Sequence, residues 1–68
     1  MKFSARNVLK GKIVSVTKGS TTAHVTIDVG GTIMTSSITK PAVDELKLAT
    51  GKEAYAVVKA SDVMIGVD

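Results

Sequence analysis

Three short segments carry the groups that could bind a small anion. Ser4, Ala5 and Arg6 supply a hydroxyl, a guanidinium and successive backbone N–H groups close to the N-terminus. A second run supplies an ammonium, another hydroxyl and more N–H groups; it consists of Lys59, Ala60 and Ser61. Thr39 adds a hydroxyl at the start of a predicted helix, where free N–H groups would point outward. A tetrahedral oxyanion carries only acceptors and needs such donors without nearby carboxylates. The pattern is compatible with an oxyanion site. The alternative is that these residues only form turns, in which hydroxyl-bearing and lysine residues are common.

Other kinds of chemistry find little support in the sequence. The absence of cysteine excludes disulfides, thiolate zinc sites and a cysteine nucleophile. His24 is the only histidine and lies on the polar side of an alternating segment, where a solvated residue is the common case. No glycine-rich phosphate loop follows a strand and opens a helix. We therefore expect no enzyme and no catalytic residue, no metal cation held directly by the protein, and no nucleotide or organic cofactor.

Alternation of apolar and polar residues predicts the elements that must position these groups. The predicted strands span residues 8–17, 21–29, 32–38, 53–59 and 63–67. Gly11 lies inside the first of them and suggests a bend or bulge, and Gly30-Gly31 forms a tight hairpin turn.

A short helix should open between the third and fourth strands. Pro41 suits its first turn, either Thr39 or Lys40 would be its cap, and Asp44 and Glu45 should lie near its positive end. Val43 and Leu46 supply an apolar stripe at helical spacing.

The resulting order is strand–strand–strand–helix–strand–strand. This is the order of a five-stranded barrel of the oligonucleotide/oligosaccharide-binding (OB) type, so the expected fold class is all-β, with residues 1–68 forming one domain. A domain of this size buries only about 60% of its unfolded surface. Because disulfides are excluded, we expect oligomerisation to supply further stability.

Charge and aromatic content limit the range of partners. The net charge of +3 is a mild basic bias that suits an anionic partner without identifying one. Proteins that bind single-stranded nucleic acid stack bases on aromatic side chains, and this chain has only Phe3 and Tyr55. A nucleic-acid-binding module is therefore the alternative function, and an unfavoured one. No run of about 18 apolar residues and no signal peptide is evident, so we expect a cytoplasmic protein without a membrane partner.

Two segments resemble a known family. Residues 4–14, Ser-Ala-Arg-Asn-Val-Leu-Lys-Gly-Lys-Ile-Val, and residues 59–64, Lys-Ala-Ser-Asp-Val-Met, are similar to the opening and closing segments of molbindins. These are small molybdate-binding proteins built from one Mop (TOBE-type) domain, and the resemblance covers essentially the whole chain. It implies an OB-type barrel and a hexamer of three dimers. It also implies that molybdate or tungstate binds, as the oxyanion, between subunits.

The resemblance also implies a set of site residues. One subunit would contribute Ser4, Ala5 and Arg6, and another Thr39, Lys59, Ala60 and Ser61. Arg6 has an alternative role in a salt bridge between subunits. The chain departs from the family at Val8, where many relatives carry glutamine, and at Ala42, where some carry a serine that reaches the anion.

The expected role is reversible binding of the oxyanion for molybdenum storage and homeostasis. Mop domains fused to DNA-binding regulators and transporter ATPases sense the anion instead. We expect storage here because the chain reads as a free-standing domain without an output module. The family has a second type of anion site, for which the turns at Lys18-Gly19-Ser20 and Gly30-Gly31 are candidates.

Overall fold

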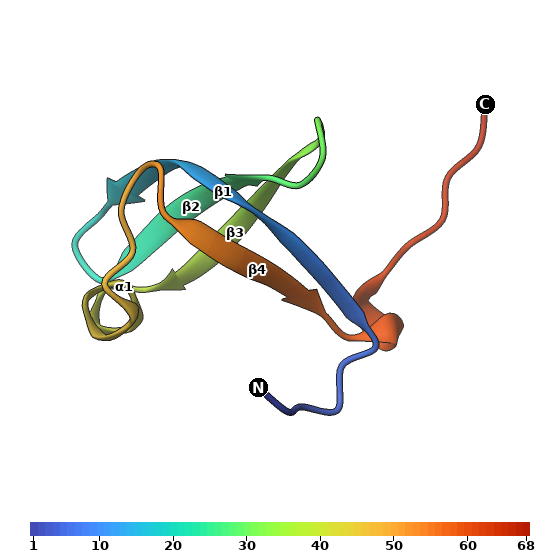
Figure 1. The fold of residues 1–68 in the computed structure, drawn as a ribbon, viewed down its shortest axis with the longest axis horizontal. Helices are drawn as coiled ribbons and strands as arrows, with labels where there is room; N and C mark the ends of the chain where they lie inside the picture. Colours follow the sequence, from blue (N-terminus) through green and yellow to red (C-terminus); the bar gives the residue numbers. More distant parts are fainter.

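One antiparallel sheet forms the body of the protein (Figure 1). The computed structural model describes residues 1–68. Its elements are β1 (Asn7–Lys18), β2 (Thr22–Asp28), β3 (Ile33–Thr39), α1 (Lys40–Leu46), β4 (Glu53–Val58) and a 3-10 helix, η1 (Ala60–Asp62). The strand order in the sheet is β3-β2-β1-β4, so β3 and β4 are its two edges. Neither helix is long and apolar enough to cross a membrane.

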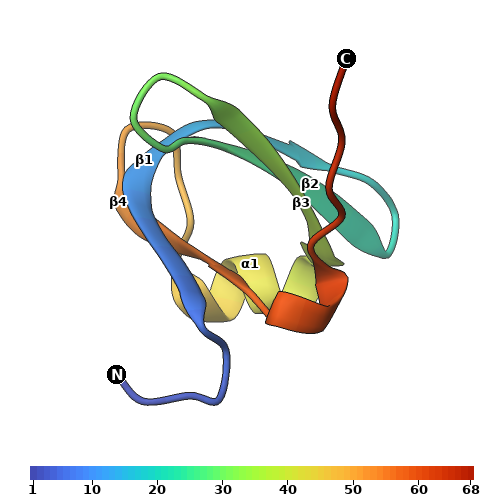
Figure 2. The same cartoon turned by 90° about the vertical axis from the view of Figure 1, so that its right-hand side faces the viewer.

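The sheet curls because its longest strand changes direction along its length. The first half of β1 pairs with β4 and the second half with β2, and the register shifts between Ile13 and Ser15. A Cβ atom at Gly11 would lie 2.2 Å from the carbonyl oxygen of Asp28, so only glycine allows the two backbones to approach this closely. The bend expected near Gly11 is therefore present, and the sheet closes partway into a half-barrel (Figure 2).

The core lies on the concave side of the half-barrel. Ala23, Val25 and Ile27 alternate inward along β2 and are buried, as the sequence pattern predicts. Ile13 of β1 joins them, and Val43 of α1 is 1% exposed. Complete burial of a valine side chain contributes about 1.5–3 kcal/mol, so Val43 is the main apolar contact of α1 with the sheet.

The predicted turn between β2 and β3 is confirmed. Gly30 and Gly31 have φ values of 75° and 96°, which other residues rarely adopt. The Oδ1 atom of Asp28 accepts a hydrogen bond from the Gly31 N–H at 2.7 Å and so closes the turn.

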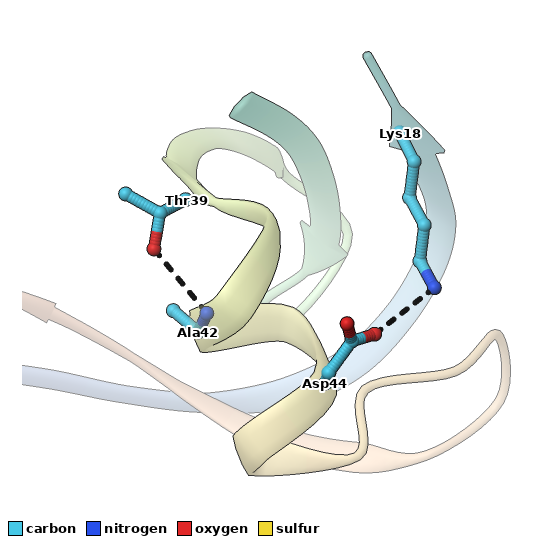
Figure 3. Close-up of polar contacts among 4 residues, drawn as sticks. All are labelled: Lys18, Thr39, Ala42 and Asp44. Atoms are coloured by element: carbon cyan, nitrogen blue, oxygen red, sulfur yellow. Dashed lines mark hydrogen bonds and ion pairs between the residues drawn. The ribbon is translucent and has the colours of Figure 1, made fainter. Parts of the chain in front are cut away.

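The helix begins as expected but uses its acidic residues differently. Thr39 is the cap, since its Oγ1 atom accepts a hydrogen bond from the Ala42 N–H at 3.2 Å (Figure 3). The expectation that Asp44 and Glu45 lie near the positive end of the helix is wrong, because the first turn of α1 contains no acidic residue. Asp44 instead forms an ion pair with Lys18 of β1 at 3.2 Å.

The apolar stripe predicted for the helix is also narrower than expected. Leu46 is 58% exposed, and Val43 is the buried residue of α1. With seven residues, the helix makes only two turns and presents little more than one side chain to the core.

The sheet has four strands instead of the expected five. After β4, η1 turns the chain, and residues 63–68, which we call the C-terminal arm, run away from the sheet (Figure 1). Met64, Ile65 and Val67 are 93%, 88% and 94% exposed. A short apolar run of this kind is typical of a strand, but a strand forms only where a partner edge lies alongside, and this chain brings none of its own edges to the arm.

Candidate functional site

Strand pairing brings most of the predicted donors to one end of the sheet. Asn7 and Val58 form the terminal pair of the β1–β4 ladder. Residues 4–6 precede Asn7 and residues 59–61 follow Val58, so the two segments leave the sheet side by side. The Nδ2 group of Asn7 also donates a hydrogen bond to the carbonyl oxygen of Val58 at 3.2 Å. We call this group the donor cluster; its members are Ser4, Ala5, Arg6, Lys59, Ala60 and Ser61.

The single turn of η1 orients one side of the donor cluster. Its first backbone hydrogen bond runs from the Asp62 N–H to the Lys59 carbonyl oxygen at 2.9 Å. The N–H groups of Ala60 and Ser61 precede this bond and have no partner inside the helix. They are therefore available, with the Ser61 hydroxyl, as donors to a bound group.

The donor cluster has an excess of positive charge. The chain contains two ion pairs, Lys10–Glu53 and Lys18–Asp44, and neither involves Arg6 or Lys59. Asp62 is the acidic residue in the same turn of η1. The donor cluster thus carries two cations outside any ion pair, with one carboxylate in the adjoining turn, and this excess of positive charge favours anions.

Exposure limits what the donor cluster can do in a single chain. Ala5 is half-buried and the other members are exposed. Between exposed charges in water, attraction is weakened by the high dielectric constant and by salt. The cluster therefore needs a cover that excludes water if it is to hold an anion firmly.

Thr39 lies far from the donor cluster. It caps α1, which stands at one end of the sheet, whereas η1 stands at the other (Figure 1). Because Thr39 Oγ1 accepts from the Ala42 N–H, its own hydroxyl proton stays free to be donated (Figure 3). The predicted site residues therefore do not form one site within a single chain.

The expectation of free N–H groups at the start of α1 is wrong. The Lys40 N–H donates to the Thr21 carbonyl oxygen at 3.1 Å, and the Ala42 N–H donates to Thr39. Pro41 has no N–H. At the start of the helix, the Thr39 hydroxyl is therefore available as a donor to an anion, whereas the backbone N–H groups are not.

The turn at Gly30-Gly31 borders a polar hollow of about 380 Å³. Lys10 and Lys12 line it, and so do the carboxylates of Asp28 and Glu53. Glu53 pairs with Lys10 at 3.8 Å. This mixture of charges is a poorer setting for a dianion than the donor cluster.

Asn7 has a structural role that its residue type alone does not indicate. Its amide joins the two donor segments, whereas the residues before it stand out by their hydroxyl, guanidinium and N–H groups. Its position directly after Ser4-Ala5-Arg6, at the first residue of a predicted strand, was the available signal.

A family model and a curated relative both match this chain over nearly its whole length. The family model described as "TOBE domain" matches residues 4–65. The chain is 55% identical over 69 residues to a "Probable molybdenum-pterin-binding protein" of Haemophilus influenzae, with 100% of both chains covered.

Solved structures agree with the sequence match. MopII from Clostridium pasteurianum superposes with a TM-score of 0.90 at 48% identity, covering 97% of this chain and 100% of that one. A molybdate-bound structure of the cytoplasmic molybdate-binding protein ModG gives a TM-score of 0.94 at 46% identity. That match covers 100% of this chain and 49% of the ModG chain. The likeness thus extends to sequence and fold over nearly all of the residues.

Proposed function

This chain belongs to the TOBE-domain family, with molybdenum-pterin-binding (Mop) proteins among its relatives, and from that premise we propose that it binds molybdate reversibly. The observation that carries the proposal is the pairing of Asn7 with Val58, which gathers the donor cluster at one end of the sheet. We further propose that tungstate, a dianion of similar size, binds the same site. In this proposal the chain is a single binding domain, residues 1–68, and not an enzyme.

The donors of the cluster suit the chemistry of such a dianion. Its four oxygens accept hydrogen bonds and donate none, so N–H groups and hydroxyls can replace its hydration shell. Lys59 adds a charge-assisted hydrogen bond, a class that contributes about 1.5–3 kcal/mol each. In our proposal Arg6 either shares this role or forms a salt bridge to another copy.

The site is proposed to lie between copies of the chain. The donor cluster is exposed, and Thr39 stands at the other end of the molecule, so Thr39 can join the cluster only from a second copy. We propose a hexamer assembled as a trimer of dimers, in which packing between copies covers the anion. Binding would then stabilise the assembly, because a ligand that binds only the assembled state favours that state.

The proposed physiological role is storage and homeostasis of molybdenum in the cytoplasm. Single-stranded nucleic acid is not supported as a ligand. Phe3 and Tyr55 are the only aromatic side chains, and Tyr55 lies on the outer face of β4, near the middle of that strand. Bases would find no row of stacking surfaces beside the basic residues.

The test is calorimetric titration of the anion-stripped protein with molybdate, with and without excess sulfate, while the mass of the assembly is recorded. We expect heat of binding that sulfate does not abolish, from a species heavier than one chain. Absence of molybdate binding by a folded protein would refute the proposal, and a shift on adding single-stranded DNA would favour the alternative function.

A further inference from the structure

Lys40 is half-buried, whereas every other lysine of the chain is exposed. The two ion pairs of the chain use Lys10 and Lys18, and the ammonium groups that donate hydrogen bonds belong to Lys18 and Lys52. Partial burial takes water away from a charged side chain, which costs free energy unless a partner replaces that water. Lys40 is therefore a cation that has lost part of its hydration and has no partner in its own chain.

The acidic residues nearest to Lys40 in the helix do not neutralise it. Asp44 lies four positions along α1, where side chains of one helix face meet. Its carboxylate instead pairs with Lys18 of β1, at 3.2 Å (Figure 3). Glu45 lies five positions along and takes part in no ion pair. The charge of Lys40 therefore stays available to a ligand.

The backbone around Lys40 is firmly held. Its N–H donates to the Thr21 carbonyl oxygen at 3.1 Å, and Thr39 beside it pairs with Thr22 in the β2–β3 ladder. Consecutive Cα atoms lie about 3.8 Å apart, and the flexible stem of a lysine lets its ammonium approach a group bound at the neighbouring residue. An anion at the Thr39 hydroxyl is therefore within reach of the Lys40 side chain, although the Lys40 N–H is already engaged.

The donor cluster by itself carries too little charge for a dianion. Arg6 and Lys59 are its cations, and Asp62 is the carboxylate of the adjoining turn, which leaves one net positive charge. In the proposed site between copies, Lys40 arrives together with Thr39 and adds a second. The two charges then equal and oppose those of molybdate. Packing between copies removes water from the site and strengthens each of these attractions.

We propose that Lys40 is a further anion-binding residue, and that it gives the site a preference for dianions over monoanions of the same shape. The inference rests on the proposed binding of molybdate between copies of the chain. The energy of a charge pair is proportional to the product of the two charges. The Lys40 ammonium therefore attracts molybdate about twice as strongly as it attracts perrhenate, a tetrahedral monoanion.

Three variants separate the charge of Lys40 from its shape and from the overall charge of the protein. Lys40→Gln removes the charge and keeps most of the length of the side chain, whereas Lys40→Arg keeps the charge. Lys47→Gln is the control, because Lys47 is an exposed lysine at the other end of α1. Neither lysine belongs to the core, so thermal unfolding should be nearly unchanged in all three variants.

Calorimetry with molybdate should show a fall in affinity of roughly fivefold in Lys40→Gln and little change in Lys40→Arg and Lys47→Gln. Equal affinity of Lys40→Gln and Lys47→Gln would overturn the inference. A lower mass of the anion-free assembly in Lys40→Gln would also overturn it, because Lys40 would then form a contact between copies. If the unaltered chain binds no molybdate, the proposed function itself fails.

Competition with perrhenate tests the preference between charges. The concentration of perrhenate that displaces half of the bound molybdate is measured for the unaltered chain and for Lys40→Gln. Loss of the Lys40 charge should weaken molybdate roughly fivefold and perrhenate roughly twofold, so the advantage of molybdate should shrink by about a factor of two. An unchanged advantage would show that Lys40 affects only the shape of the site, and would overturn the proposed preference.

Discussion

Asn7 and Val58 are joined twice, as the terminal pair of the β1–β4 ladder and by the 3.2 Å hydrogen bond from the Asn7 side chain to the Val58 carbonyl oxygen. This double connection sets the spacing between Arg6 and Lys59, which are their direct neighbours in sequence. The donor cluster is therefore an outcome of strand register, because a slip of the ladder would separate the two segments that supply it.

Removal of the Asn7 amide should weaken the proposed binding of molybdate more than it weakens the fold. Asn7→Ala loses one partly buried hydrogen bond, which contributes about 0.5–1.5 kcal/mol to stability. We expect a fall in melting temperature of a few degrees, together with weaker molybdate binding because the two donor segments are less firmly aligned. Calorimetry and thermal unfolding of the same sample measure both effects. Unchanged affinity in Asn7→Ala would show that the amide does not organise the site.

Gly11 should tolerate no side chain. In Gly11→Ala the new Cβ would meet the Asp28 carbonyl oxygen, and backbone atoms must move apart. Overpacking of this kind costs about 1–3 kcal/mol. Chemical denaturation should show the loss, and Gly66→Ala is the control because a Cβ there meets nothing within 4 Å. Equal stability of Gly11→Ala and the unaltered protein would contradict the close approach of β1 and β2.

The features that the sequence predicts correctly depend on residues close together in the chain. Alternation along β2, the positive φ at Gly30 and the cap at Thr39 each involve neighbours within a few positions. The arm is a short apolar run with β-branched residues, as is typical of a strand, yet it forms none, because a strand also requires an edge from elsewhere in the fold.

Long-range contacts explain the other differences from expectation. The Lys40 N–H donates a hydrogen bond to the Thr21 carbonyl oxygen, and the Asp44 carboxylate forms an ion pair with Lys18. Neither contact can be predicted from the residues next to it in the sequence. Residue types and the family resemblance together indicate the donor segments. Their adjacency in one chain depends on the β1–β4 register, which residue types alone do not determine.

Thr39 has two roles that substitutions can separate. Its Oγ1 atom accepts from the Ala42 N–H, and we propose that its hydroxyl proton is donated to the anion of another copy. Thr39→Asp keeps an acceptor for the cap, so stability should change little, but it replaces the donor with a negative charge that repels the anion.

Thr39→Ser is the matched control, since it keeps both the acceptor and the donor. We expect molybdate binding to be lost in Thr39→Asp and retained in Thr39→Ser, as measured by calorimetry at equal thermal stability. Similar affinity in the two variants would remove Thr39 from the proposed site.

Lys59 should contribute more to anion binding than any lysine outside the donor cluster. It is exposed and has no carboxylate partner, so its charge is available to a ligand, and its removal should cost little stability. Loss of one charge-assisted hydrogen bond, about 1.5–3 kcal/mol, corresponds to a fall in affinity of roughly tenfold or more in Lys59→Ala. Lys12→Ala is the control, because Lys12 is exposed, is also outside both ion pairs and lies at the other end of the β1–β4 ladder. Titration with molybdate at two salt concentrations measures the difference. If Lys59→Ala and Lys12→Ala weaken binding equally, the lysine acts through the overall charge of the protein and does not contact the anion.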